Sequence, residues 1–202
     1  MRNLCREAPR NARAVTCVAV GRNEQPLRSE LEAFVNAAFL RKHGAHVRSF
    51  MPTLLSWNVG GARLGVVGLR AAQEEALYLE NYLEAPIERT LAERAGRQLP
   101  RARIVEIGHL ASRNCLAAAR IAAALPRYLL ELEYEWIVFT GTRTVRGILG
   151  RLGAPLHELA PASAECVSAT PDSWGRYYDA EPRVYAGFLP DTRRIPVFLS
   201  GA

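Results

Sequence analysis

Glu106 and His109 are the two residues whose types and positions most suggest chemistry. They interrupt the otherwise apolar stretch between Arg103 and Arg113, which reads as an interior strand running into a helix. A carboxylate and an imidazole are costly to bury unless they are paired or used. We therefore predict that Glu106 orients or deprotonates an amine and that His109 relays the proton. A structural ion pair, or a hydrogen-bonded core histidine, is the alternative.

The spacing of this pair sets a condition on that prediction. The two residues are three positions apart, so in a regular strand their side chains point to opposite faces. Only a bulge or an early end of strand pairing would bring both into one cleft.

The helix that follows this strand offers an anion site. Strand-to-helix junctions present free N–H groups and a positive dipole end, which suits phosphate. Arg113, Arg120 and Arg127 are seven apart and share one helical face, with Arg113 nearest the start. The functional interpretation is a pyrophosphate site, and the alternative, which the bare pattern favours, is a solvated arginine stripe.

A second constellation combines carboxylates with tyrosines. Glu80, Glu84 and Glu88 are four apart and would share a helical face if Pro86 allows it, although like charges at this spacing repel. Such a face is either solvated or binds a cation. Tyr78 and Tyr82 either line a pocket or belong to the core.

The remaining chemistry-bearing residues are less specific. His43 and His46 lack a third ligand nearby, so we predict no metal site. The polar, aromatic segment 174–183 suits either a loop over a site or a packed excursion. The sequence contains no G-x-S-x-G, Walker A, Rossmann or H-E-x-x-H motif, which removes the usual support for a hydrolase, an NTPase or a dehydrogenase.

The elements that must position these residues follow from apolar periodicity and turn residues. We expect a strand over 14–20, then a helix from Pro26 to Gly44 with a Ser29/Glu32 capping box. Strands over 47–57 and 63–70 are joined by the hairpin turn 58–61. A helix over 77–96, interrupted at Pro86, precedes strand 103–111, helix 113–132 with a kink at Pro126, strand 135–141, helix 142–153 and a tail of short strands. This order predicts one α/β domain over 1–202, with a mixed central sheet and helices on both faces.

Composition fits this picture. The chain has 202 residues, 49% of them hydrophobic and 23% charged, and a net charge of +6. Lys42 is the only lysine among 26 basic residues. An arginine-rich surface suits CoA phosphates, an acidic carrier protein, a nucleic acid or an anionic membrane, and a genomic base-composition bias is the simpler explanation.

Cysteine usage and the first residues bear on the compartment. The four cysteines form no C-x-x-C pair, which favours a reducing compartment. No apolar run approaches the roughly 20 residues needed to span a bilayer. The start of the chain only faintly resembles a signal peptide, so we expect a cytoplasmic protein, with secretion as the alternative.

Several blocks, in order, resemble the thermostable hemolysin family from about residue 25 to 187. They are Phe50-Met-Pro-Thr-Leu-Leu, Leu79-Glu-Asn-Tyr-Leu-Glu-Ala-Pro-Ile-Glu88, Ile104-Val-Glu-Ile-Gly-His-Leu-Ala-Ser112, Phe139-Thr-Gly-Thr142, Arg151-Leu-Gly153 and Trp174-Gly-Arg-Tyr-Tyr178. This resemblance implies a GNAT-like fold related to the acyl-homoserine-lactone (autoinducer) synthases and N-acyl amino acid synthases. Glu106 matches the active-site glutamate on the central strand of those enzymes. The implied acyl donor is an acyl-CoA or an acyl carrier protein.

The sequence departs from the GNAT pattern at two positions. Leu116 replaces the first glycine of the phosphate loop, and a leucine Cβ crowds a backbone that must approach pyrophosphate closely. Leu149 stands where many GNAT enzymes place the tyrosine that protonates the leaving thiolate. His109, Tyr177 or Tyr178 would have to substitute, or the thiolate leaves unaided.

The resemblance implies an N-acyltransferase that moves an acyl group from a thioester to an amine of a small acceptor, for which an amino acid is one option. The thioester is a co-substrate; we expect no tightly bound cofactor, no metal and no nucleic-acid partner, and we make no prediction of membrane contact or oligomeric state. Besides Glu106 and His109, the donor side would comprise Leu110, Ser112, Arg113, Asn114, Thr140, Thr142 and Arg143. The substrate-binding residues would be Tyr78, Glu80, Tyr82, Trp174, Tyr177 and Tyr178.

Two other functions remain open. A membrane-active hemolysin fits the basic surface, although no long uncharged amphipathic segment is present to insert. Lysis caused by an acylated, surfactant-like product would unite that function with acyl transfer. The third option, motivated by Leu116 and Leu149, is a non-catalytic GNAT-fold binding module.

Overall fold

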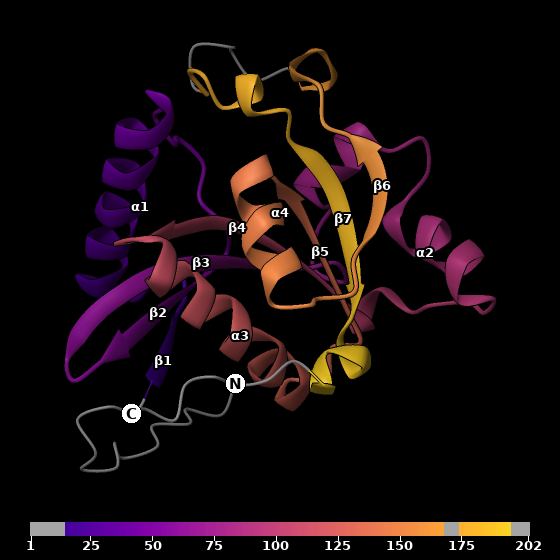
Figure 1. Ribbon diagram of the computed structural model, residues 1–202, viewed down its shortest axis with the longest axis horizontal. Helices are drawn as coiled ribbons and strands as arrows, with labels where there is room; N and C mark the ends of the chain where they lie inside the picture. The colour runs from indigo at the N-terminus through magenta and orange to yellow at the C-terminus, as the bar shows by residue number, and fades with distance from the viewer. Residues whose placement is uncertain (1–14, 168–173, 195–202) are drawn as a thin grey trace.

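The computed structural model describes residues 15–167 and 174–194, whose strands form one seven-stranded sheet (Figure 1). The strand order is β1-β2-β3-β4-β5-β7-β6, and only the neighbours β4 and β5 run parallel. The strands are β1 (Val15–Val20), β2 (Thr53–Val59), β3 (Ala62–Ala71), β4 (Ile104–Ser112), β5 (Trp136–Gly141), β6 (His157–Pro161) and β7 (Arg183–Phe188). The main helices are α1 (Leu27–His43), α2 (Ile87–Ala95), α3 (Cys115–Glu131) and α4 (Arg143–Arg151).

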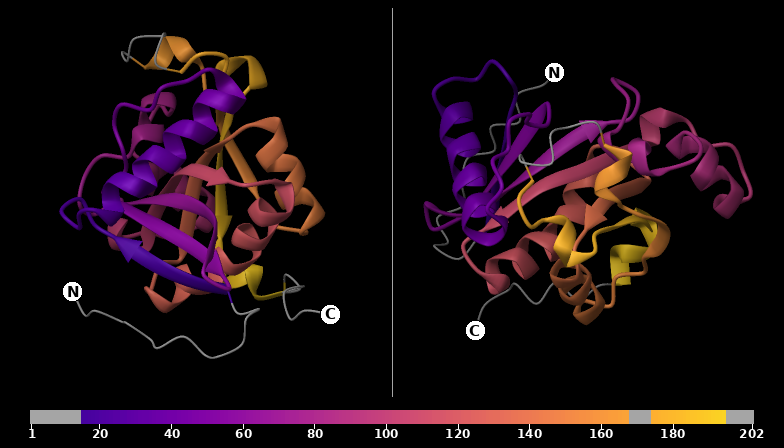
Figure 2. Two further views of the ribbon diagram at one scale, coloured as in Figure 1. Left: turned by 90° about the vertical axis from the view of Figure 1, so that its left-hand side faces the viewer. Right: turned by 90° about the horizontal axis from the view of Figure 1, so that it is seen from above.

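Helices cover both faces of the sheet, as the sequence predicted. Seen from above, α1 and α2 lie on one side of the strands and α3 and α4 on the other (Figure 2). Ile104 of β4 packs with the 3-10 helix η1 (Tyr78–Tyr82) and α2, whereas Val105 and Ile107 pack with α3. This alternation along β4 confirms a mixed α/β sheet with helices on both faces.

Helix α1 packs Leu31 and Val35 against the sheet, and it ends where the sequence predicted. Gly44 takes the left-handed conformation there (φ 65°), which glycine adopts without strain. The predicted capping box is wrong because α1 begins at Leu27. Ser29 therefore lies inside the first turn, where its hydroxyl bonds the Gln25 side chain at 2.7 Å.

The strand predicted over 47–57 also begins later, at Thr53. Side chains from α1 fix the preceding segment without strand pairing. Arg28 is buried and donates to the carbonyls of Met51 and Pro52, at 2.8 and 3.1 Å, and Asn36 accepts from the Val47 N–H. The hairpin turn that joins β2 to β3 is confirmed, with positive φ at both of its glycines, 60 and 61.

The helix predicted over 77–96 is interrupted at Pro86, as the sequence predicted, and its first part is the short 3-10 helix η1. Residue 85 precedes a proline, which disfavours helical backbone there, so the chain breaks between η1 and α2. Glu80 and Glu88 consequently do not share one helical face. Instead, both carboxylates pair with Arg101, at 2.8 and 2.5 Å, which ties η1 to α2.

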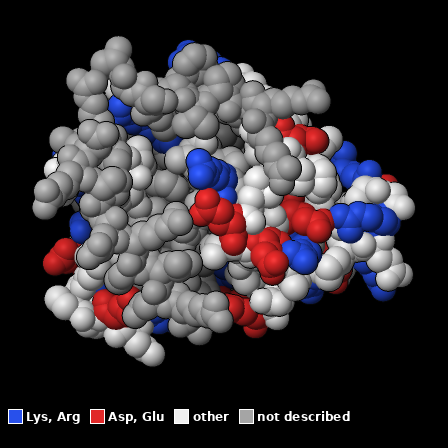
Figure 3. All heavy atoms as spheres, turned by 90° about the horizontal axis from the view of Figure 1, so that it is seen from below, with Lys and Arg blue, Asp and Glu red and all other residues white. Residues whose placement is uncertain are grey.

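The surface carries mixed charges. On the face seen from below, the described basic and acidic side chains are interspersed (Figure 3). Within the described ranges, no helix combines the length and the apolar character that crossing a bilayer requires.

Candidate active site

A β-bulge in β4 brings Glu106 and His109 to the same face of the sheet. Gly108 pairs with Gly68 of β3, and Ala111 pairs with Val66, so two residues of β4 lie opposite the single Val67. His109 is the extra residue, and it takes a positive φ of 50°. The condition set by the three-residue spacing is therefore met.

The parallel pairing of β4 with β5 stops close to this bulge. The last pair joins Ile107 to Phe139, although β4 continues to Ser112 and β5 to Gly141. The facing edges of the two strands are unpaired from that point on. Between β4 and β5, a molecule can therefore extend from one face of the sheet to the other at this gap without breaking any hydrogen bond between the two strands.

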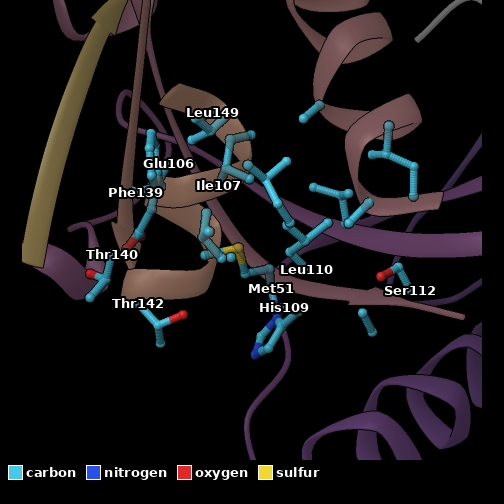
Figure 4. A pocket seen from close by; sticks show the side chains of 18 of the residues that line it. Met51, Glu106, Ile107, His109, Leu110, Ser112, Phe139, Thr140, Thr142 and Leu149 are labelled. Atoms are coloured by element: carbon cyan, nitrogen blue, oxygen red, sulfur yellow. The ribbon is translucent and has the colours of Figure 1, made fainter. Parts of the chain in front are cut away.

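A cavity of about 610 Å³ occupies the gap and extends onto both faces. Figure 4 shows residues of β4, β5 and α4 converging on it. Both predicted catalytic residues line it, as do the sequence-predicted Leu110, Ser112, Thr140, Thr142, Tyr78, Tyr82, Trp174, Tyr177 and Tyr178.

Glu106 is the buried carboxylate of the cavity, with only 3% of its surface exposed. Its two oxygens accept hydrogen bonds from the backbone N–H groups of Tyr78 and Leu79 in η1, at 2.9 and 3.0 Å. Arg70 of β3 approaches to 3.7 Å. Burial outweighs these contacts and raises the pKa of Glu106 to about 7, which suits a group that exchanges protons near neutrality.

His109 is held by its neighbours and not by Glu106. The Met51 N–H donates to His109 Nδ1 at 3.4 Å, and the Phe39 and Phe50 rings pack against the imidazole, at centroid distances of 6.3 and 5.5 Å. The Met51 side chain fills the space above Gly108, where a Cβ would meet its Cε at 2.5 Å. Gly108, which lies between Glu106 and His109 in the sequence, therefore leaves the space that the Met51 side chain occupies.

Aromatic rings form the wall of the cavity between α1 and η1. Trp174 contacts Phe39, Tyr78 and Tyr177, at centroid distances of 6.5, 6.0 and 5.5 Å. Tyr177 also contacts His43, at 5.3 Å. The segment after residue 173 therefore packs over the site.

On the other face of the sheet the cavity is apolar. Its walls come from α3, α4 and the chain that follows α4, and they consist of Ile121, Ala122, Leu125, Val145, Ile148, Leu149, Leu152 and Leu156. Gly187 of β7, which pairs with Ile137 of β5, also lines this part of the cavity.

Three buried hydroxyl groups in the lining lack a partner. Those of Tyr78, Thr140 and Thr142 form no hydrogen bond to any described residue. Because buried polar groups are normally satisfied, these positions are suited to polar atoms of a ligand.

Four sequence-predicted site residues lie outside the cavity lining. Arg113 is exposed beyond Ser112, and Asn114 accepts from the Ala117 N–H to cap α3. Arg143 pairs with Glu181 at the surface, and Glu80 is used by Arg101 as described above.

Sequence reasoning missed several lining residues. Phe39 and Met51 read as ordinary apolar positions, and His43 suggested only a metal ligand. Arg70 could have been found, because β3 and β4 pair in antiparallel register and Arg70 lies directly opposite Glu106. That inference required a register that the apolar pattern alone did not fix.

Comparison with solved structures shows what this fold is similar to. TofI in an apo form aligns with a TM-score of 0.61 at 14% identity, covering 92% of this chain and 99% of that one. FeeM, an N-acyl amino acid synthase from uncultured soil microbes, aligns with a TM-score of 0.57 at 12% identity over 92% and 98%. BjaI, a CoA-dependent acyl-homoserine lactone synthase solved with SAM and isopentyl-CoA, aligns with a TM-score of 0.57 at 14% identity. The alignment covers 89% of this chain and 86% of that one.

These similarities show that the chain shares the GNAT-like fold of these proteins, while the family comes from the sequence. No curated protein matches the chain. The family model described as thermostable hemolysin matches residues 21–192, which is most of the chain, and the protein therefore belongs to the thermostable hemolysin family.

Proposed function

We propose that this protein is an N-acyltransferase that moves an acyl group from a phosphopantetheine thioester to the amine of a small acceptor. The observation that carries the proposal is the continuous cavity that links buried Glu106 to an apolar chamber through the gap between β4 and β5. A thioester lying in that gap would present its carbonyl carbon to one face and its acyl chain to the other.

Glu106 is the proposed general base. The acceptor amine attacks the thioester carbonyl, the new C–N bond forms and the C–S bond breaks. Glu106 takes the proton that the amine loses, and the leaving thiolate gains a proton to become the free thiol. A pKa near 7 lets Glu106 accept and release this proton at neutral pH.

The donor would lie along the unpaired edges of β4 and β5, in reach of Leu110, Ser112, Thr140 and Thr142. Arg113 follows at the surface, where its guanidinium suits the diphosphate of CoA or an acidic carrier protein. Leu116 is 69% exposed, so its side chain points away from the protein. The shared chemistry of the two donors is the phosphopantetheine thioester.

Tyr177 is the proposed acid for the leaving thiolate, in place of the residue that Leu149 replaces. Its hydroxyl lies 3.5 Å from the Thr140 carbonyl oxygen, at the edge of the gap. Burial raises its pKa, so it remains protonated at neutral pH. The neighbouring Tyr178 hydroxyl is engaged with Tyr82 at 2.8 Å, which makes it the less available donor.

The aromatic wall between α1 and η1 would receive the acceptor. An amino acid fits its size and chemistry, and FeeM offers a precedent among proteins of this fold. SAM, bound in the BjaI structure, is the other acceptor to compare.

The test is a turnover assay with purified protein. Saturated acyl-CoAs of increasing length, and the same acyl groups on a carrier protein, are offered together with single amino acids or SAM. Thiol release and the mass of the N-acyl product are then measured. Stoichiometric thiol and amide product from either donor supports the proposal. Binding of the thioester without turnover with any acceptor would leave a binding module instead.

A further inference from the structure

His109 is held in one orientation by its backbone conformation and by its neighbours. The bulge sets its backbone at a positive φ, the Met51 N–H meets Nδ1, and two phenylalanine rings hold the plane of the imidazole. Met51 is itself positioned because Arg28 of α1 donates to its carbonyl at 2.8 Å. A side chain constrained from so many elements has a defined donor and acceptor pattern.

That pattern places a proton on Nε2. Because Nδ1 accepts from a backbone N–H, the neutral ring must carry its hydrogen on the other nitrogen. Burial and the positive charges of Arg70 on β3 and Arg28 on α1 lower the pKa of His109 to about 4, so the ring stays neutral at physiological pH. Nε2 has no hydrogen-bond partner among the described residues and is available to a ligand.

The lining of the cavity that contains His109 favours an anion. Arg41, Lys42 and Arg48, at the end of α1 and just after it, line the same cavity and are exposed. None of them takes part in an ion pair within the described residues. Glu106 is the one carboxylate in the described lining. Unpaired cations in the lining of one cavity create a field that attracts negative charge, and the neutral His109 donor can then bind the anion by a hydrogen bond.

We propose that His109 Nε2–H and these cations form a carboxylate subsite, so that the acceptor is an amine that carries a carboxylate. The inference rests on the proposed function, and it names the acceptor class for that site. Held by its carboxylate at His109, such an acceptor would direct its amine at Glu106 on the same face. This role differs from the proton relay expected from the sequence, because an Nε2 that already carries a proton cannot accept another.

The kinetic test compares phenylalanine with phenylalaninamide, which differ only in the carboxylate. We expect His109→Phe to raise KM for phenylalanine about tenfold while leaving kcat, and both constants for the amide, within about twofold. His109→Gln is the matched control, because it meets the same positive φ and retains an N–H donor. It should keep most of the affinity. Equal losses with both acceptors, or a loss confined to kcat, would overturn the subsite.

A second measurement does not depend on turnover. Nitrogen-15 spectra of the imidazole rings, assigned with His109→Gln, report which ring nitrogen carries the proton. We expect the Nε2–H form, and a shift of that resonance on adding N-acylphenylalanine but not its amide. Finding the Nδ1–H form, or the same shift with both ligands, would refute the inference. If the carboxylate ligand bound but no acyl transfer occurred, the carboxylate subsite would stand and the proposed function would be wrong.

Discussion

The two halves of the cavity differ in almost every property of their walls. Between α1 and η1 the lining combines aromatic rings with Glu106, His109 and several cations, whereas between α3 and α4 it is made of aliphatic side chains. The three unpartnered hydroxyl groups and all of the shifted titratable groups described above belong to the first half or to the gap. The contrast indicates two occupants of unlike chemistry that meet at one point.

The sheet explains how such unlike chambers coexist. Side chains alternate across a strand, so the two faces of β4 are normally isolated from each other by paired backbone. Only beyond Ile107 and Phe139, where pairing stops, can a molecule extend from one face to the other. The chemistry is expected at this boundary, and each half can be perturbed separately.

The largest expected effect comes from the polar half. Glu106→Gln removes the proposed base while preserving the shape of the side chain, and kcat should fall by roughly 10²- to 10⁴-fold. Thiol release from an acyl-CoA in the presence of acceptor is the measurement.

Glu84→Gln is the control for this substitution. Glu84 is an exposed carboxylate just after η1, outside the cavity lining, and its loss should leave turnover within about twofold. If Glu106→Gln retained comparable activity with an intact fold, acyl transfer would not depend on the polar half.

The pH dependence of kcat/KM is the second expectation. Because burial raises the pKa of Glu106 to about 7, the base form disappears as pH falls through that value. Activity should then decline about tenfold per pH unit. A hydrazide acceptor stays uncharged over this pH range, so the acidic side of its pH profile reports the titration of the enzyme and not of the acceptor. If the apparent pKa of this acidic side lay near the ordinary value for glutamate, Glu106 would not be the titrating base.

The third expectation concerns the apolar half alone. A Cβ at Gly187 would meet Ile137 Cγ2 at 3.2 Å and Leu156 Cδ2 at 3.4 Å, and all three residues line the apolar chamber, so Gly187→Val narrows that chamber. We expect kcat/KM for the longest acceptable acyl chain to fall about tenfold, with the shortest nearly unaffected. Competition between acyl-CoAs of two lengths measures the ratio directly. Uniform loss across lengths would place the acyl chain elsewhere.

The smallest expected effect is that of Gly147→Ala, which is the control for the substitution in the apolar half of the cavity. Gly147 lies on the exposed side of α4, and a Cβ added there would project into open space. Gly147→Ala should stabilise the protein by about 0.5–1 kcal/mol and raise Tm by about 2 °C. Chain-length preference should not change. Thermal unfolding checks the first part, and a lower Tm would show that α4 needs flexibility at this position.

Much of the scaffold could be predicted because its signals are local. The apolar run of β4, the glycines of the β2–β3 turn and the C-cap at Gly44 each act within a few residues. The start of the strand before Thr53 was mispredicted, whereas the interruption at Pro86 was predicted correctly. The segment before Thr53 depends on Arg28, which reaches across the structure to the carbonyl oxygen of Met51. The position of η1 against α2 depends in the same way on Arg101, which pairs with Glu80 and Glu88.

The candidate site divides in the same way. Glu106 could be identified from the sequence because a carboxylate within an apolar strand is unusual on either face of the sheet. Whether His109 joined it could not be decided from the pattern, since the bulge depends on pairing with β3 and on packing of Met51. The cations at the end of α1 and just after it were missed because charged residues at a helix end usually face only solvent.

The bulge in β4 has a consequence for how such sites arise. With His109 removed, Gly108 would still pair with Gly68 and Ala111 with Val66, now in one continuous register, and every flanking side chain would keep its face. A one-codon insertion or deletion at this point therefore adds or subtracts an imidazole without disturbing the sheet. Evolution can alter what the polar half recognises in a single genetic step, at a position where the fold tolerates a change in chain length.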